Sequence, residues 1–419
     1  MPLPKLAGSL QFRRNGMHAA RPRYRLYFTL VLFQIARLME NVTQPKGAAI
    51  DRKALLSGVR SVVIKIGTNA LSDAAGRLDT SLIASFAHQV AALVERKIRV
   101  TMVSSGAISA GIAELGLAAR PKDLPMLQAT ASVGQSILMK LFADAFRPHN
   151  LHVGQILITR GDFDDRARYL NLRNCIHALH KSNCIPIINE NDSVAVAEIR
   201  YGDNDLIAAD VTNLLRADLL VLLTVVDGLL DSAGNTIPLV QDVDDAANNV
   251  DEHKKSSRGT GGMGSKLFAA GTVKQAGEPV LIANGKRPNV IVDLMNGVDT
   301  GTLILPARKK LSSRSRWIGL TARPRGTIIV DDGAAKALRA NKSLLASGIT
   351  ATEGEFDAGD PVLIVAKDNT VIAHGLSNYA RAEVELIRGH KSSEFSRLLK
   401  TETYYDEVIH RDDLVIDSK

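Results

Sequence analysis

Cysteine, aromatic residues and long apolar runs are all scarce in this sequence. Two cysteines, Cys175 and Cys184, occur in 419 residues, which is too few for a disulfide framework and typical of a reducing compartment. The apolar run from Leu26 to Ile35 is shorter than the roughly 20 residues that a membrane-spanning helix needs. We therefore expect a cytoplasmic protein with no membrane partner. Its 45% hydrophobic content still suffices for a large buried core.

Basic residues are concentrated at the start of the chain. Residues 1–50 contain eight Lys or Arg and one acid, Glu40, which accounts for most of the formal net charge of +8. From Gly326 to Lys419, acids outnumber bases by 16 to 11. An acidic C-terminal part is a poor surface for phosphates, so we expect no nucleic-acid partner. Residues 1–56 read as a basic, poorly ordered extension, either an upstream addition or a targeting segment.

Apolar runs rich in β-branched residues alternate with helical patterns between residues 57 and 322. This order predicts an α/β fold with a mainly parallel, open sheet sandwiched by helices. Trp317 and Ile318 mark the expected end of that sheet domain, and residues 323–326 an expected linker. We expect strands at 61–69, 99–103, 152–158, 184–188, 219–224 and 302–305, and helices at 80–94, 125–146, 169–180, 206–215 and 267–275.

The pattern changes after the linker. Short apolar runs at 327–330, 361–365 and 370–375 are separated by glycines, as in a small β-rich barrel. We assign this barrel to residues 326–404 and treat residues 405–419 as a C-terminal tail.

Carboxylates and amides directly follow the apolar run from Cys184 to Ile188. The stretch 189–205 begins Asn-Glu-Asn-Asp and ends Gly-Asp-Asn-Asp. In open α/β sheets, ligands bind at the carboxyl ends of the strands. Asp192, Asn204 and Asp205 are suited to binding an ammonium group, positioning a metal-bound phosphate or orienting a lysine. Taken alone, a stretch of this composition is more often a solvated polar loop than a binding site.

Two lysines lie where a phosphate could be bound. Lys65 sits inside an apolar strand that runs into Gly67 and Thr68; it needs an anionic partner, unless the strand lies at a sheet edge where the side chain can reach solvent. Lys266 follows the glycine-rich loop 259–264, which can wrap a phosphate at a helix start. The loop is not a Walker A motif, and the sequence lacks a dinucleotide-binding glycine fingerprint.

These motifs, in this order, resemble the glutamate 5-kinases of the amino-acid kinase family, in the long form with a C-terminal PUA domain. The resemblance covers about residues 57 to 416. It rests on Lys65-Ile-Gly-Thr, Ser104-Ser-Gly-Ala, Gly134-Gln135, Asn189-Glu-Asn-Asp192, Gly202-Asp-Asn-Asp205, Gly259-Thr-Gly-Gly-Met263 with Lys266, and the module from Gly326 to Gly389.

The resemblance implies transfer of the γ-phosphoryl group of ATP to the side-chain carboxylate of L-glutamate, the first step of proline biosynthesis. It assigns catalysis to Lys65 and Lys266, with Asp205 orienting both, and no metal ligand to the chain itself, because Mg²⁺ would be bound through the ATP phosphates. Glutamate binding falls to Ser105, Asp192 and Asn204. ATP binding falls to Lys65, Thr224, Val225, Thr260, Gly261, Gly262, Met263, Gly264, Ser265 and Lys266.

Feedback inhibition by proline and a homo-oligomeric state are further expectations from the family. One residue departs from its pattern: the family usually has Thr-Asp after the fifth core strand, where this chain has Thr224-Val225, with Asp227 two residues on. A kinase acting on another acid is one alternative. Another is an RNA-binding protein with a vestigial kinase domain, which the acidic C-terminal part does not favour.

Overall fold

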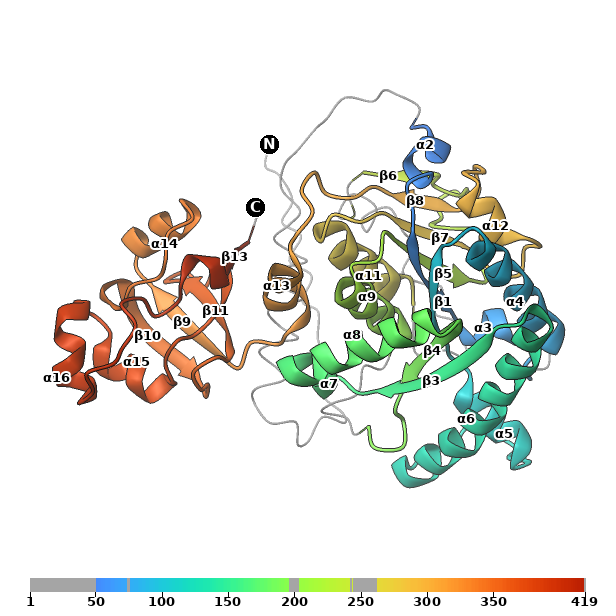
Figure 1. Cartoon of the computed structure of the whole chain (residues 1–419), viewed down its shortest axis with the longest axis horizontal. Coiled ribbons are helices and arrows are strands. Elements are labelled where there is room, and N and C mark those ends of the chain that lie inside the picture. The colour runs from blue at the N-terminus through green and yellow to red at the C-terminus, as the bar shows by residue number, and fades with distance from the viewer. Residues whose placement is uncertain (1–49, 74–75, 196–202, 242, 244–261, 418–419) are drawn as a thin grey trace, which may run out of the picture. The chain divides into compact units, whose positions relative to one another are not determined.

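The structure is a computed structural model that describes residues 50–73, 76–195, 203–241, 243 and 262–417. Two β-sheets organise this part of the chain (Figure 1). The first sheet has the strand order β3-β4-β2-β1-β5-β7-β8-β6. Its neighbouring strands are parallel except for the antiparallel pair β7 and β8, which confirms the mainly parallel sheet. The strands are β1 (Ser61–Ile66), β2 (Arg99–Val103), β3 (His152–Ile158), β4 (Cys184–Glu190), β5 (Leu219–Thr224), β6 (Leu239–Val240), β7 (Val280–Asn284) and β8 (Thr302–Ile304).

Helices cover both faces of this sheet (Figure 1). Successive side chains of a strand point to opposite faces; accordingly Val62, Ile64 and Ile66 pack with α4, α6 and α12, whereas Val63 packs with α8, α9 and α11. The helices are α2 (Arg52–Leu56), α3 (Thr68–Leu71), α4 (Thr80–Glu95), α5 (Ala107–Glu114), α6 (Leu124–Phe146), η1 (Arg147–His149), α7 (Gly161–Asp164), α8 (Arg166–Lys181), α9 (Asn204–Leu215), α11 (Met263–Gln275), α12 (Val290–Met295) and α13 (Ser313–Arg316).

Side-chain caps fix where several helices begin. The Asp79 carboxylate accepts the backbone N–H groups of Ser81 and Leu82 at 2.9 and 3.2 Å and so caps the N-terminus of α4. Asp123 caps α6 in the same way, one residue before the helix begins. Arg52 of α2 is buried and donates to the carbonyl of Thr300 at 2.8 Å. The expected lack of order therefore does not hold for residues 52–56, whereas residues 1–49 lie outside the described part.

The segment from Trp317 to Thr321 lies at the expected end of the sheet domain and forms a single π-helical turn, η2. The turn is buried: the Trp317 indole lies in the apolar cluster beside α8 and α9 and donates its N–H to the carbonyl of Phe163 at 2.9 Å. A tryptophan would also suit a buried strand, so composition alone does not predict the turn.

The second sheet has the order β10-β9-β11-β12-β13 and its own apolar core. The strands β9 and β11 are parallel and the other neighbours antiparallel. β13 pairs with β12, so the sheet extends beyond residue 404 into the segment interpreted as a tail. The elements are β9 (Gly326–Val330), α14 (Asp332–Arg339), η3 (Ala346–Gly348), β10 (Ile349–Gly354), β11 (Pro361–Ala366), β12 (Val371–Leu376), α15 (Arg381–Ile387), η4 (Ser392–Glu394), α16 (Phe395–Leu399), η5 (Arg411–Asp413) and β13 (Leu414–Ile416).

Among the described residues, no helix has both the length and the apolar character needed to cross a bilayer.

Candidate active site

Lys65 lies in the middle of the first sheet. Its strand, β1, is paired on both sides, with β2 and with β5, so it is not an edge strand. The side chain is 4% exposed and faces the layer of α9 and α11. Its Nζ lies 2.6 Å from Oδ1 of Asp205. The interpretation of Lys65 as a lysine that reaches solvent is therefore wrong, and the anionic partner that its burial requires is a carboxylate of the chain itself.

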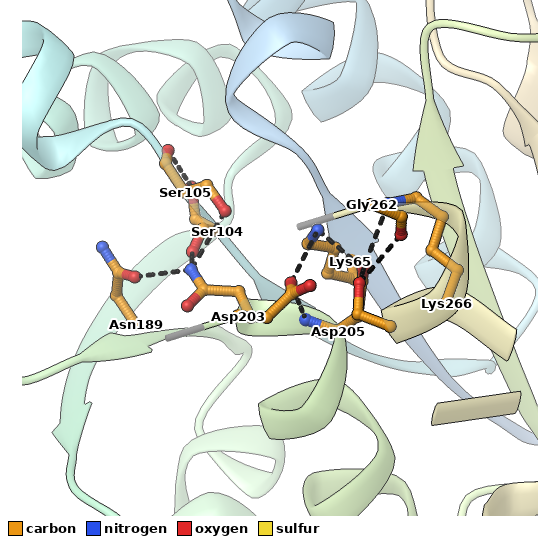
Figure 2. Close-up of polar contacts among 10 residues, drawn as sticks. Lys65, Ser104, Ser105, Asn189, Asp203, Asp205, Gly262 and Lys266 are labelled. Carbon is orange, nitrogen blue, oxygen red and sulfur yellow. Dashed lines mark hydrogen bonds and ion pairs between the residues drawn. The ribbon is translucent and has the colours of Figure 1, made fainter. Parts of the chain in front are cut away.

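A second lysine binds the other oxygen of the same carboxylate (Figure 2). Asp203 caps α9 by accepting the backbone N–H of Asp205 at 2.9 Å, which places Asp205 in the first turn of that helix. Lys266 lies in the first turn of α11, and its Nζ donates to Oδ2 of Asp205 at 2.9 Å. Two ammonium groups from different elements thus meet on one fully buried carboxylate.

The lysines decide the charge of Asp205. Burial alone would raise the pKa of this carboxyl, but Lys65 and Lys266 more than offset it and hold the pKa below the ordinary value. Burial also raises the pKa of Asp203, and the nearby charge of Asp205 raises it further. Lys65 lies 3.9 Å from Asp203, too far to compensate fully. Asp205 is thus the ionised centre of the cluster, and Asp203 is the carboxyl whose charge is disfavoured.

A network of neutral side chains lies beside this cluster (Figure 2). The amide nitrogen of Asn204 donates to Oγ of Ser105 at 3.0 Å, to Oδ1 of Asn189 at 2.9 Å and to the carbonyl of Ser104. Asn189 in turn donates to the side chain of Gln135 on α6 at 2.9 Å. The network joins the carboxyl ends of β2 and β4 to the first turn of α9.

Close backbone contact between α5 and α6 holds the turn that carries Ser104 and Ser105. Gly106, the residue before α5, has a φ of +104°, a conformation that side chains rarely adopt. At Gly134 of α6, an added Cβ would lie 1.8 Å from the carbonyl oxygen of Ala107. Any larger residue there would push the two helices apart, and with them the serines of the site.

The comparisons with known proteins agree with this geometry. Residues 60–284 match the amino acid kinase family, and residues 326–399 match the PUA domain. The chain is 44% identical over 372 residues to a protein of Geobacter sulfurreducens named glutamate 5-kinase, covering 87% of this chain and 100% of that protein. A protein of the same name from Syntrophus aciditrophicus is 43% identical and is covered to 96%. The chain belongs to the amino acid kinase family, in its glutamate 5-kinase branch.

The departure of this kinase from the family pattern lies at the carboxyl end of β5. Thr224 is the last residue of that strand, and the Val225 side chain after it is 41% exposed. Asp227 is held by the amide of Asn284 at the end of β7, with a distance of 3.0 Å. A carboxylate is therefore present near this end of the sheet, but it comes from Asp227 and is oriented by Asn284.

The structure brings together most residues that the sequence of this kinase singles out. Lys65, Lys266, Asp205, Asn204 and Ser105 meet in the cluster and network described above. Asp192 is half-buried in the turn after β4. Gly262, Met263, Gly264 and Ser265 form the cap and first turn of α11, while Thr260 and Gly261 lie outside the described residues.

Sequence reasoning missed Asp203, Asn189 and Gln135 as participants. All three belong to motifs quoted above, so their place in those motifs was a usable signal. Their contact was not predictable, because Gln135 lies on α6, more than 50 residues before the Asn189 amide that donates to it.

No group of three or more His, Cys, Asp or Glu side chains that could hold a metal ion by themselves occurs in the described ranges. Within the described part of the chain, two buried carboxylate oxygens of the site accept no hydrogen bond: Oδ1 of Asp205, which forms the ion pair with Lys65, and Oδ2 of Asp203. This donor set does not suit a metal bound by the protein alone. It suits a hard cation that brings most of its oxygen ligands with it, as Mg²⁺ does when bound to phosphates.

Proposed function

We propose that this protein phosphorylates the side-chain carboxylate of L-glutamate with ATP, giving L-glutamyl 5-phosphate, the first step of proline biosynthesis. The single observation that carries the proposal is the pair of ammonium groups on Asp205. Two buried lysines converge at the carboxyl ends of the central strands, where open α/β sheets bind their ligands. The name of the relatives supports the same reaction.

The chemistry needs charge and alignment more than proton transfer. A carboxylate is already nucleophilic, so no general base is required. The difficulty is to bring two anions together in line and to stabilise the charge of the phosphoryl group in transfer. Lys65 and Lys266 supply two positive charges in a buried place, where they act more strongly than in water. Asp205 holds them near each other although they repel, which makes it a positioning residue.

Glutamate binding falls to the neutral network and to Asp192. Ser105 and Asn204 offer uncharged hydrogen-bonding groups to the carboxylates of the substrate. Asp192 supplies a negative charge suited to its ammonium group, which a neutral acceptor would bind less strongly. An acid without that ammonium group should therefore be a poor substrate.

We assign ATP binding to Thr224, Val225 and the start of α11. The backbone N–H groups of Gly262 to Ser265 are at a helix N-terminus, which favours an anion, and Lys266 adds a charge in the same turn. Mg²⁺ would be held by the ATP phosphates, with Asp203 as the carboxylate within the site, and would offset the charge of the transferred group. Because Val225 stands where the family usually has aspartate, Asp227 is the carboxylate that can border the nucleotide at the end of β5.

Three further features belong to the proposal. We expect inhibition by proline, which shares the α-carboxylate and amino nitrogen of glutamate, a homo-oligomer, and a location in the cytoplasm. The PUA domain has an acidic composition, which supports a structural or regulatory role over nucleic-acid binding.

The test is ATP turnover by the purified chain with hydroxylamine present to trap the acyl phosphate. Hydroxamate formed with L-glutamate, and not with L-aspartate or N-acetyl-L-glutamate, supports the proposal. Turnover with N-acetyl-L-glutamate instead would assign the chain to a different acid. If no acid gives turnover, Val225→Asp separates two explanations: recovery of activity indicates a weakened nucleotide site, and no recovery contradicts the proposed function.

A further inference from the structure

A buried ion pair between Arg160 and Asp210 of α9 has no role in the chemistry described above. Arg160 follows β3 and is buried, and its NH1 donates to Oδ2 of Asp210 at 2.5 Å. Asp210 is 4% exposed. It lies five residues after Asp205 on the same helix, roughly 7.5 Å further along the axis at 1.5 Å per residue.

The other end of the guanidinium binds two further segments. Its NH2 donates to the carbonyl of Thr321, the last residue of η2, and lies 3.3 Å from Oδ1 of Asp164. Asp164 also accepts the backbone N–H of Arg323 at 3.2 Å. One planar side chain therefore joins α9 to α7 and to the segment that leads out of the first sheet domain. A lysine has a single nitrogen and cannot make this set of contacts.

Apolar side chains of α9, among them Ile207, Val211 and Leu214, are fully buried and hold the helix against its neighbours. Apolar packing is not directional, so it leaves the exact position of the helix along its axis to be set by directional contacts. Hydrogen-bonded charges fix both distance and direction. A change in the position of α9 would move Asp205, Asn204 and Asp203 together, because all three lie in its first turn or cap.

We propose that Arg160 is a positioning residue for phosphoryl transfer: through Asp210 it fixes α9 in the position that places the Asp205 carboxylate between Lys65 and Lys266. The claim that Arg160 affects phosphoryl transfer rests on the proposed function. The claim that Arg160 places Asp205 does not depend on which substrate is phosphorylated.

Arg316 provides a matched control. It is also a fully buried arginine, and its NH2 donates to Oε1 of Glu278 at 2.6 Å. Its partner precedes β7 and lies outside α9. Loss of Arg160 removes the ion pair of the buried Asp210, and loss of Arg316 removes one of two ion pairs of the buried Glu278, which keeps its pair with Lys310 at 2.7 Å. Both changes should lower stability. Only loss of Arg160 should change the site.

The first measurement is the rate at which an amine-reactive reagent labels Lys65 and Lys266 in the folded protein, quantified on peptides by mass spectrometry. We expect both rates to rise about tenfold in Arg160→Met, the equivalent of roughly 1.4 kcal/mol, and to stay unchanged in Arg316→Met. Equal rates in the two variants would overturn the proposal. If Arg160→Met does not fold, Arg160→Lys keeps the positive charge but loses the planar guanidinium. We then expect a smaller increase in the labelling rates of Lys65 and Lys266.

The second measurement separates positioning from stability. In Arg160→Met we expect kcat to fall about 100-fold, the effect of displacing a catalytic group by roughly 1 Å, and the KM for glutamate to rise by a smaller factor, because Asn204 moves with α9. In Arg160→Met/Asp210→Leu, apolar packing should restore the melting temperature but not kcat. Recovery of kcat together with stability would show a purely structural role and overturn the proposal. Wild-type turnover, measured in parallel, tests the proposed function, while labelling tests the placement of Asp205 even without turnover.

Discussion

Asn204 and Asp205 are adjacent in the chain, yet they organise two different halves of the site. Asp205 centres a charged half, in which one carboxylate binds two lysines. Asn204 centres a neutral half, in which one amide nitrogen donates to three oxygens. The charged half concentrates positive charge for a transferring phosphoryl group. The neutral half offers groups that can exchange hydrogen bonds with a substrate without a change in net charge.

The two halves also differ in what their loss costs. Removing one partner of a buried ion pair leaves a charge without compensation, which typically costs 3–5 kcal/mol. Removing one neutral hydrogen bond typically costs about 1 kcal/mol. Variants in the charged half should therefore affect both folding and turnover, and variants in the neutral half mainly substrate affinity.

Asp205→Asn should have the largest effect. It leaves two buried ammonium groups facing each other, so we expect the free energy of unfolding at pH 7 to fall by about 3 kcal/mol and hydroxamate formation to become undetectable. The pKa of Asp205 is held below the ordinary 3.8, so its stabilising effect is present above that value and is lost as the pH falls through the lower, folded-state pKa. Urea unfolding of both proteins from pH 7 to pH 3 measures this. A difference that grows towards low pH would contradict the assignment of an ionised Asp205.

Lys266→Met tests the charged half without leaving an unpaired buried cation, because Lys65 keeps its ion pair with Asp205. We expect turnover to fall about 1,000-fold, the upper range for loss of one group that stabilises transition-state charge. Glutamate binding, followed by calorimetry, should remain, because the neutral half is intact. Lys140→Met is the control, since this lysine lies on the exposed face of α6 in a surface pair with Asp144 and should have little effect. Retained turnover in Lys266→Met, or loss of the fold, would remove Lys266 from the proposed role.

The sequence predicts some residues of these two halves and not others. The difference is whether a residue's role depends on its local environment or on a distant partner. A lysine inside an apolar strand requires an anion, so the importance of Lys65 can be read from the sequence. The identity of that anion cannot, because Asp205 is 140 residues away and the contact depends on how α9 crosses β1. The order of the motifs along the chain was the main sign that such distant residues meet. It was most useful where polar residues directly follow a strand, because the carboxyl ends of parallel strands lie at the same edge of the sheet.

The limits of sequence interpretation have the same origin. β13 has only three residues, and its pairing with β12 supplies order that its own pattern does not reveal. Trp317 suits a buried strand as well as the π-helical turn that it occupies. The roles of Gln135 and Arg160 arise from contacts between segments distant in sequence, and neither has a local pattern that indicates its partner.

Asn204→Leu should have a moderate effect confined to the neutral half. The change removes the amide donor from Oγ of Ser105 and from Oδ1 of Asn189, which still accepts the backbone N–H of Glu190, and it adds no charge near Asp205. We expect the KM for glutamate to rise about tenfold, the equivalent of roughly 1.4 kcal/mol, with kcat little changed, since contacts made equally in ground and transition state affect KM alone. Steady-state kinetics of hydroxamate formation measures both constants. A fall in kcat at constant KM would instead place this half in contact with the transition state.

Asp203→Asn should have the smallest effect on stability, and the effect should have the opposite sign. Burial and the neighbouring Asp205 raise the pKa of Asp203, so its ionised form is a cost to the folded state, whereas asparagine keeps an oxygen for the backbone N–H of Asp205. A raised folded-state pKa means that the cost is fully present above that pKa and vanishes as the pH falls towards the ordinary 3.8. We expect the melting temperature at pH 7 to rise by about 2 °C, with a gain that shrinks at acid pH. Asp412→Asn, at an exposed carboxylate, should show neither change. A lower melting temperature for Asp203→Asn would mean that Lys65 stabilises the Asp203 charge as well, so that the charged half has two anionic centres.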